Sequence, residues 1–134
     1  MGGWCADMVI NPYYESKIYI GSVSHAPLHA NLKLFIDMGD LWGVIGTEQE
    51  KYKMIIPVRV TKTTFFSRSN YKEDGFEIAA INYPRVSATI EEIDEFMLIL
   101  ARRLLTRFWQ HRVGIVNPKE IIMLTEEEDR YEDE

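Results

Sequence analysis

The chain has 134 residues, a formal net charge of −6 and a hydrophobic content of 46%. This length fits one domain, the composition is that of an ordinary globular protein, and the single cysteine excludes an internal disulfide. No apolar run approaches the ~20 residues that a membrane span needs, and no basic start followed by an apolar stretch marks a signal peptide. We therefore expect a cytoplasmic protein, in the host cell if it is viral, with no membrane partner.

The negative charge is concentrated at the C-terminus. Residues 126–134 hold seven of the 21 acids and one of the 15 bases, which leaves 14 acids and 14 bases in the rest of the chain. Such an acidic run is typical of a solvated, disordered segment, although it can also contact a basic partner. We expect a single domain over residues 1–125 and an acidic disordered tail over residues 126–134.

The first half of the sequence predicts strands. Residues 16–23 are rich in β-forming side chains, and residues 31–38 alternate between apolar and polar side chains. A period of two fits a half-buried strand. Gly39 and Asp40 then indicate a turn, and residues 41–46 its hairpin partner.

Further strands are expected in the middle of the chain. Residues 52–66 alternate again, and Pro57 inside this run favours an edge position or a bulge. Asp74 and Gly75 have the chemistry of a turn. Residues 76–83 predict another strand.

One long helix is expected over residues 88–112. Thr89 can cap its start, and Glu92, three residues on, can bond back to the cap. Its middle is apolar all the way round, whereas a surface helix carries a polar stripe. We therefore expect it to be buried on more than one side, against a copy of itself. The predicted oligomer interface consists of Phe96, Leu98, Ile99 and Leu100.

The segments after the helix are short. Residues 113–116 indicate a turn, and residues 120–124 a last strand or short helix. Strands followed by a helix, without alternation, are typical of the α+β class. The predicted fold is an antiparallel sheet of about five to six strands followed by one long C-terminal helix, assembled into an oligomer through that helix.

No strong catalytic, metal or cofactor motif is present, so we predict no catalytic residue, no metal and no cofactor. His25 and His29 have a spacing that suits two ligands on a helix, but Pro27 lies between them. The absence of phosphate loops and of an aromatic ladder among lysines argues against nucleic-acid partners. A basic run in the middle of the chain is interpreted as a solvated strand face: Lys51, Lys53, Arg59, Lys62 and Arg68.

The arginines give the strongest chemical signal. Arg103 and Arg107 are four residues apart, so a helix places them on one face. Guanidinium groups suit bidentate capture of phosphate. Phe76 could stack on a base and Asn82 could hydrogen-bond to its edge. Intersubunit or tail salt bridges are the alternative role for the arginines.

This layout resembles phage proteins that defeat Thoeris immunity by sequestering cyclic ADP-ribose signals. The resemblance covers about the last third of the chain before the tail, and rests on Phe76, Asn82, Arg103 and Arg107. It implies a strand-rich protein with a helical C-terminal part that assembles as an oligomer and holds its ligand between subunits.

The resulting hypothesis is a non-enzymatic phage antidefence protein that sequesters a small phosphorylated cyclic nucleotide at a subunit interface. Its partners would be itself and that nucleotide. One alternative is a protein–protein inhibitor of a host defence factor, acting through an acidic or apolar surface. A second alternative is a small enzyme that processes nucleotides.

Overall fold

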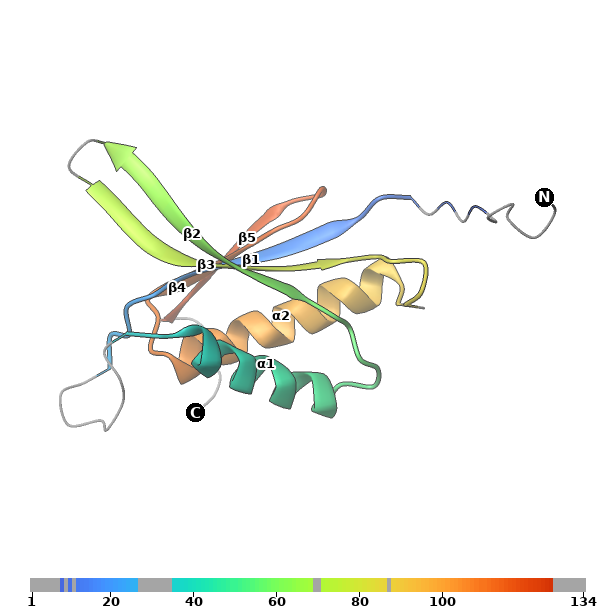
Figure 1. The fold of residues 1–134 in the computed structure, drawn as a ribbon, viewed down its shortest axis with the longest axis horizontal. Coiled ribbons are helices and arrows are strands. Elements are labelled where there is room, and N and C mark those ends of the chain that lie inside the picture. The colour runs from blue at the N-terminus through green and yellow to red at the C-terminus, as the bar shows by residue number, and fades with distance from the viewer. Residues whose placement is uncertain are drawn as a thin grey trace, which may run out of the picture.

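The structure is a computed structural model that describes residues 8, 10, 12–26, 35–68, 71–86 and 88–126. Figure 1 shows a sheet with helices packed against one of its faces. The elements, in chain order, are β1 (Glu15–Gly21), α1 (Met38–Lys51), β2 (Arg59–Arg68), β3 (Tyr71–Ile81), α2 (Ile90–Arg107), β4 (Arg112–Val116) and β5 (Ile121–Thr125).

The described residues form a sheet of five strands in the order β2-β3-β1-β4-β5, and every neighbouring pair is antiparallel. The predicted α+β class with an antiparallel sheet is confirmed. In the central strand β1, Ser16, Ile18 and Ile20 are buried and alternate with half-buried residues. This period of two places one face of the sheet against the helices.

The strand boundaries show two further outcomes. β2 starts at Arg59, so Pro57 precedes the strand instead of lying inside it, and β2 is an edge strand of the sheet. Residues 113–116 are not a turn but lie in β4, which pairs with both β1 and β5. The long helix is therefore not the C-terminal element, because two strands follow it and complete the sheet.

The region before β2 differs from its prediction. Instead of a turn and a hairpin strand, residues 38–51 form the helix α1; residues 31–34 of the other expected strand lie outside the described residues. Asp37 caps this helix: its carboxylate accepts from the Asp40 backbone N–H at 2.8 Å, and the Asp40 carboxylate accepts from the Asp37 N–H at 3.0 Å. Because both cap contacts form together, they fix the first turn despite the glycines that follow.

α2 begins as predicted and ends earlier than predicted. Thr89 and Glu92 form the expected capping box, and the helix ends at Arg107 with Phe108 as its C-cap. It contacts β1, β3, β4 and β5 on one side and α1 on the other. The prediction that this helix is buried on more than one side is therefore confirmed, and both packing partners, the sheet and α1, belong to the same chain.

The residues predicted for an oligomer interface have different environments within the chain. Phe96 and Leu100 are fully buried in the hydrophobic core, and Leu98 packs partly against it. Ile99 remains 42% exposed. The apolar belt is thus explained largely by packing within one chain, and a helix-mediated oligomer stays a prediction.

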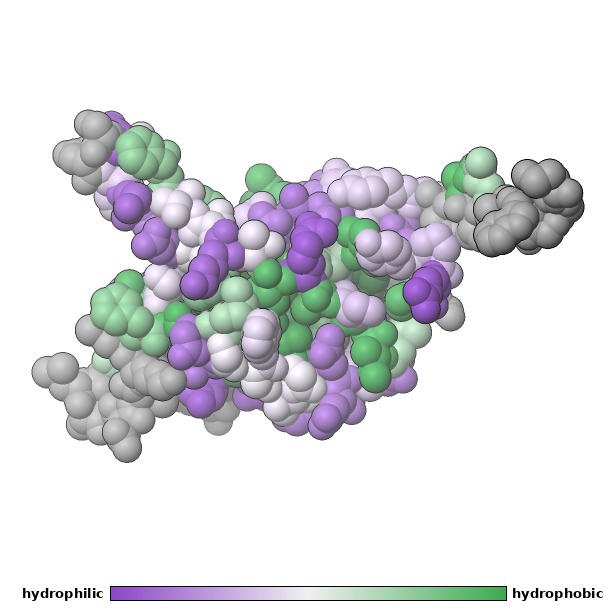
Figure 2. Space-filling model, viewed as in Figure 1, coloured by the Kyte–Doolittle hydropathy of each residue, from purple (hydrophilic) through white to green (hydrophobic). Residues whose placement is uncertain are grey.

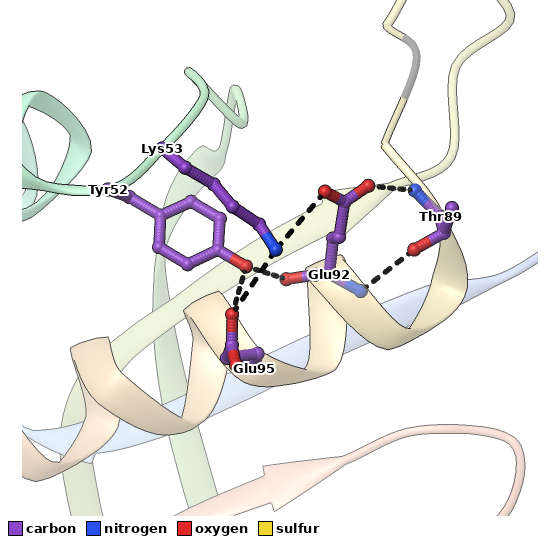
Figure 3. A network of polar contacts seen from close by, with 5 residues as sticks. All are labelled: Tyr52, Lys53, Thr89, Glu92 and Glu95. Atoms are coloured by element: carbon purple, nitrogen blue, oxygen red, sulfur yellow. Dashed lines mark hydrogen bonds and ion pairs between the residues drawn. The ribbon is translucent and has the colours of Figure 1, made fainter.

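The segment that follows α1 is held on the first turns of α2 (Figure 3). The Tyr52 hydroxyl donates to Glu95 at 2.6 Å and lies 3.2 Å from the Glu92 carbonyl, while Lys53 approaches the Glu92 carboxylate at 3.5 Å. Burial and the hydrogen bond to Glu95 raise the pKa of Tyr52, so its hydroxyl stays protonated. These contacts connect the end of α1 to the start of α2.

We expect Tyr52→Phe to lower the free energy of unfolding by about 1 kcal/mol, because a hydrogen bond to an acidic but exposed partner is lost. Tyr83→Phe is the control, since Tyr83 is 55% exposed. Urea unfolding followed by circular dichroism measures both variants. Equal stability of the two would show that the Tyr52 contact contributes nothing.

The predicted division at residue 125 is not tested. Glu126, the last described residue, lies with its carboxylate 2.8 Å from Nδ1 of His111, and the remaining tail residues lie outside the described part. Within the described residues, no helix combines the length and the apolar character needed to cross a membrane.

Candidate functional site

The four residues predicted to bind a ligand lie in three different places. Asn82 follows β3, where its side-chain oxygen accepts from the Tyr14 backbone at 2.8 Å and its amide donates to the Pro12 carbonyl at 2.5 Å. Phe76 is 4% exposed and belongs to the hydrophobic core. Arg103 and Arg107 lie on α2 beside α1. The fold of one chain therefore does not bring them together, and their ligand-binding role stays a prediction.

The two arginines border a groove between the helices, which we call the α1–α2 groove. Its volume is about 450 Å³. Arg103 Nε lies 3.6 Å and Lys51 Nζ 3.7 Å from the carboxylate of Glu48, which is 6% exposed. The groove is lined by Gly39, Asp40, Gly43, Val44, Thr47, Glu48, Lys51, Arg103, Arg107 and Phe108.

The charge of this groove is slightly positive. Three cationic side chains line it against two acidic ones, and both Arg103 and Lys51 face the same buried carboxylate. A buried charge needs such partners, since leaving Glu48 alone would be costly. The arginine at position 103 therefore has a structural role between α1 and α2.

A second concave region lies at the other side of α1, between its first residues and the β2–β3 hairpin. Figure 2 shows the surface hollowed between the projecting end of this hairpin and the beginning of α1. We call it the hairpin notch, and its volume is about 500 Å³. It is lined by Ser22, Phe35, Ile36, Asp37, Met38, Lys62, Thr63, Thr64, Asp74, Gly75 and Phe76.

Backbone hydrogen bonds hold three segments together at the notch. The backbone N–H and the hydroxyl of Ser22 both donate to the Asp74 carbonyl, each at 3.0 Å. The Ile36 N–H donates to the Ser22 carbonyl at 2.8 Å. The end of β1, the segment before α1 and the middle of β3 are therefore fixed relative to one another.

Gly75 allows the strands to come this close. A Cβ atom at this position would clash with the carbonyl oxygen of Ile20 on β1. The expected turn at Asp74–Gly75 is wrong, because both residues lie inside β3. The glycine is required by the close approach of two strands and not by a change of chain direction.

The polar side chains of the notch share one face of the sheet. Lys62 and Thr64 pair with Phe76 and Asp74 across β2 and β3, and the Thr64 hydroxyl donates to the Asp74 carboxylate at 2.9 Å. Phe76 is directed into the core. Because side chains alternate along each strand, Lys62, Thr64 and Asp74 lie on the same face of the sheet as Phe76. Phe35, at the rim, is 63% exposed and offers an aromatic surface.

The notch therefore combines the features of a small-molecule site. It has apolar walls, a free aromatic ring, hydroxyl groups, two acidic side chains and one basic side chain. Pockets for small ligands have volumes of roughly 300–1,000 Å³ and combine apolar walls with a few polar groups. Its acids outnumber its bases, which is the reverse of the α1–α2 groove.

Comparison with known proteins shows similarity in structure only. No protein-family model and no curated protein matches the sequence. The structure is similar to a phage SAM lyase in complex with S-methyl-5′-thioadenosine, with a TM-score of 0.61 and 13% sequence identity over 92% of this chain and 98% of that chain. It is also similar to a phage SAM lyase in the apo state, with a TM-score of 0.61 and 14% identity over 85% of this chain and 90% of that chain.

This similarity corrects the functional hypothesis drawn from the sequence. A non-enzymatic protein that sequesters a cyclic nucleotide is wrong, because the matched structures, which cover nearly the whole chain, are of an enzyme. At this level of identity the similarity establishes a shared fold. The alternative that fits it better is the small enzyme acting on nucleotides.

Most residues of the notch carry no sign of a binding role in the sequence. Lys62 was interpreted as part of a solvated strand face, and Asp74 as a turn residue. Ser22 and Phe35 lie within predicted strands, and nothing in their sequence pattern indicates a ligand site. The period of two in residues 52–66 could have placed Lys62 and Thr64 on one face, but nothing in the sequence shows that α1 and the end of β1 enclose that face.

Proposed function

We propose that this protein is an enzyme that cleaves S-adenosylmethionine (SAM), a lyase of the kind to which its fold is similar. The observation that carries the proposal is the similarity of fold over 92% of this chain and 98% of the phage SAM lyase bound to S-methyl-5′-thioadenosine. The structure of a phage SAM lyase in the apo state matches with the same TM-score of 0.61. A phage enzyme that consumes host SAM also agrees with an antidefence role.

The hairpin notch is the site that we assign to this reaction. SAM carries a sulfonium and an ammonium group against one carboxylate, so its net charge is positive. Asp37 and Asp74 line the notch against Lys62, whereas cations outnumber acids in the α1–α2 groove. The exposed ring of Phe35 can stack on adenine, because every base offers a π-face to an aromatic side chain.

The proposed chemistry needs the substrate to be oriented more than it needs a nucleophile from the protein. The bond between sulfur and Cγ of the methionine chain breaks, its electron pair stays on sulfur, and S-methyl-5′-thioadenosine leaves as a neutral thioether. The remaining carbon fragment completes the valence of Cγ by attack of its own carboxylate oxygen, which closes a lactone and needs no outside nucleophile and no proton acceptor. The contribution of the protein is to hold the flexible chain in a reactive geometry.

Asp74 is the acidic group that we expect to face the cationic end of the substrate. Its carboxylate is held by the Thr64 hydroxyl, and its backbone carbonyl is held by Ser22, so the group is fixed before a ligand enters. Asp37 is already engaged as the cap of α1. Asp74 is therefore the acid of the notch that is available to a ligand.

The test is incubation of the purified protein with SAM, followed by chromatography and mass spectrometry. We expect S-methyl-5′-thioadenosine to accumulate with time and with protein concentration, at the expense of SAM. Heat-denatured protein is the control for spontaneous breakdown of SAM. If SAM stays intact beyond that background, the proposed function is wrong.

A further inference from the structure

We propose that Lys62 binds the α-carboxylate of the substrate and so distinguishes SAM from analogues that lack this group. The inference rests on the proposed function and deepens it. Lys62 is the basic residue among those that line the hairpin notch. If the notch binds a substrate with a carboxylate, Lys62 is the cation of the notch lining that can pair with that group.

The register of the hairpin separates this cation from the acidic group. Lys62 pairs with Phe76, while Asp74 pairs with Thr64, two residues further along β2. Residues two apart on a strand point to the same face and are roughly 7 Å apart. The notch thus presents a positive and a negative group at different points along one wall.

This separation matches the amino-acid end of SAM. Within that end, the carboxylate lies on one side of Cα, and the ammonium and sulfonium groups lie on the others. Asp74 can face the cations while Lys62 faces the carboxylate. Within the described part of the chain, Lys62 takes part in no ion pair, so a bound carboxylate would not have to displace an acidic partner.

The strand position of Lys62 fixes the point on the notch wall from which its exposed side chain extends. Its backbone belongs to the continuous β2–β3 ladder, whose register is regular from Arg59 to Phe66. Beside it on the same face of the sheet, its cross-strand partner Phe76 is 4% exposed and packs in the core. The aliphatic stem of a lysine can lie along such an apolar wall while its ammonium group stays at the ligand.

The experiment compares SAM with decarboxylated SAM, which differs from it only in this carboxylate. For Lys62→Met we expect kcat/KM for SAM to fall roughly five- to tenfold, because one charge-assisted contact at a partly solvated site is lost. The dissociation constant of decarboxylated SAM, measured by calorimetry, should stay within about twofold of the wild-type value, because the lost contact is absent from that ligand. Lys62→Arg should keep most of the activity.

Lys72→Met is the matched control, because Lys72 is an exposed lysine on the partner strand of the same hairpin, opposite Phe66 and outside the notch lining. It should change neither measurement. If Lys62→Met weakens the binding of decarboxylated SAM by the same factor as it lowers kcat/KM for SAM, Lys62 supports the site without contacting the carboxylate. Unchanged cleavage of SAM by Lys62→Met would overturn the inference while the proposed function stands, whereas no cleavage by the wild type overturns both.

Discussion

Replacing Leu100 by alanine should lower the free energy of unfolding by about 2.5–5 kcal/mol, the range for truncation of a fully buried leucine. Leu100 is 0% exposed in the middle of α2, where the helix lies between the sheet and α1. A cavity there has few ways to close, because the sheet and α1 are both fixed by their own contacts. Urea unfolding followed by circular dichroism gives the value.

Ile99→Ala is the control, because Ile99 is the adjacent residue of the same helix and is 42% exposed. We expect it to cost at most about 1 kcal/mol, since part of its side chain already meets solvent. A loss for Ile99→Ala as large as that for Leu100→Ala would mean that a second chain covers this part of α2. Light scattering at several protein concentrations would then show an assembly, which the sequence analysis predicted and which remains a prediction.

Replacing Asp74 by asparagine should reduce kcat/KM for SAM by roughly 10- to 30-fold, because a carboxylate that faces a cationic substrate is replaced by a neutral group. The substitution keeps the size of the side chain and an oxygen that can accept from the Thr64 hydroxyl. The fold should therefore survive, and the melting temperature serves as a check. The measurement is the initial rate of S-methyl-5′-thioadenosine formation over a range of SAM concentrations.

The matched control for this prediction is Glu73→Gln, which removes the neighbouring charge of β3. Glu73 precedes Asp74 and points to the opposite face of the sheet, so it is absent from the lining of the notch. An equal reduction in both variants would indicate a general effect of charge on a cationic substrate. Normal activity of Asp74→Asn would exclude the hairpin notch as the place where the cationic end of SAM binds.

The sequence predicted those elements whose signal is local. The capping box of Thr89 and Glu92 lies within four residues, so the start of α2 could be found without the rest of the fold. The strand predicted at residues 16–23 was found in the same way, from its β-forming side chains. Local signals failed at α1, where the alternation in residues 31–38 and the apparent turn at Gly39 and Asp40 indicated strands, although the Asp37–Asp40 cap starts a helix.

The candidate site depended on contacts that no local pattern contains. The α+β class, the antiparallel sheet and the helix α2 that packs on that sheet were determined by the sequence alone. Only the tertiary structure placed Phe35, Lys62 and Asp74 around one notch. Lys62 and Asp74 are brought together by the pairing of β2 with β3, and the segment of Phe35 is joined to the chain after β1 by the Val23–Phe35 bridge. The tertiary structure also separated Phe76 and Asn82 from Arg103 and Arg107: spacing along a chain defines neighbours on one helix or strand, whereas neighbours between elements are decided by how those elements pack.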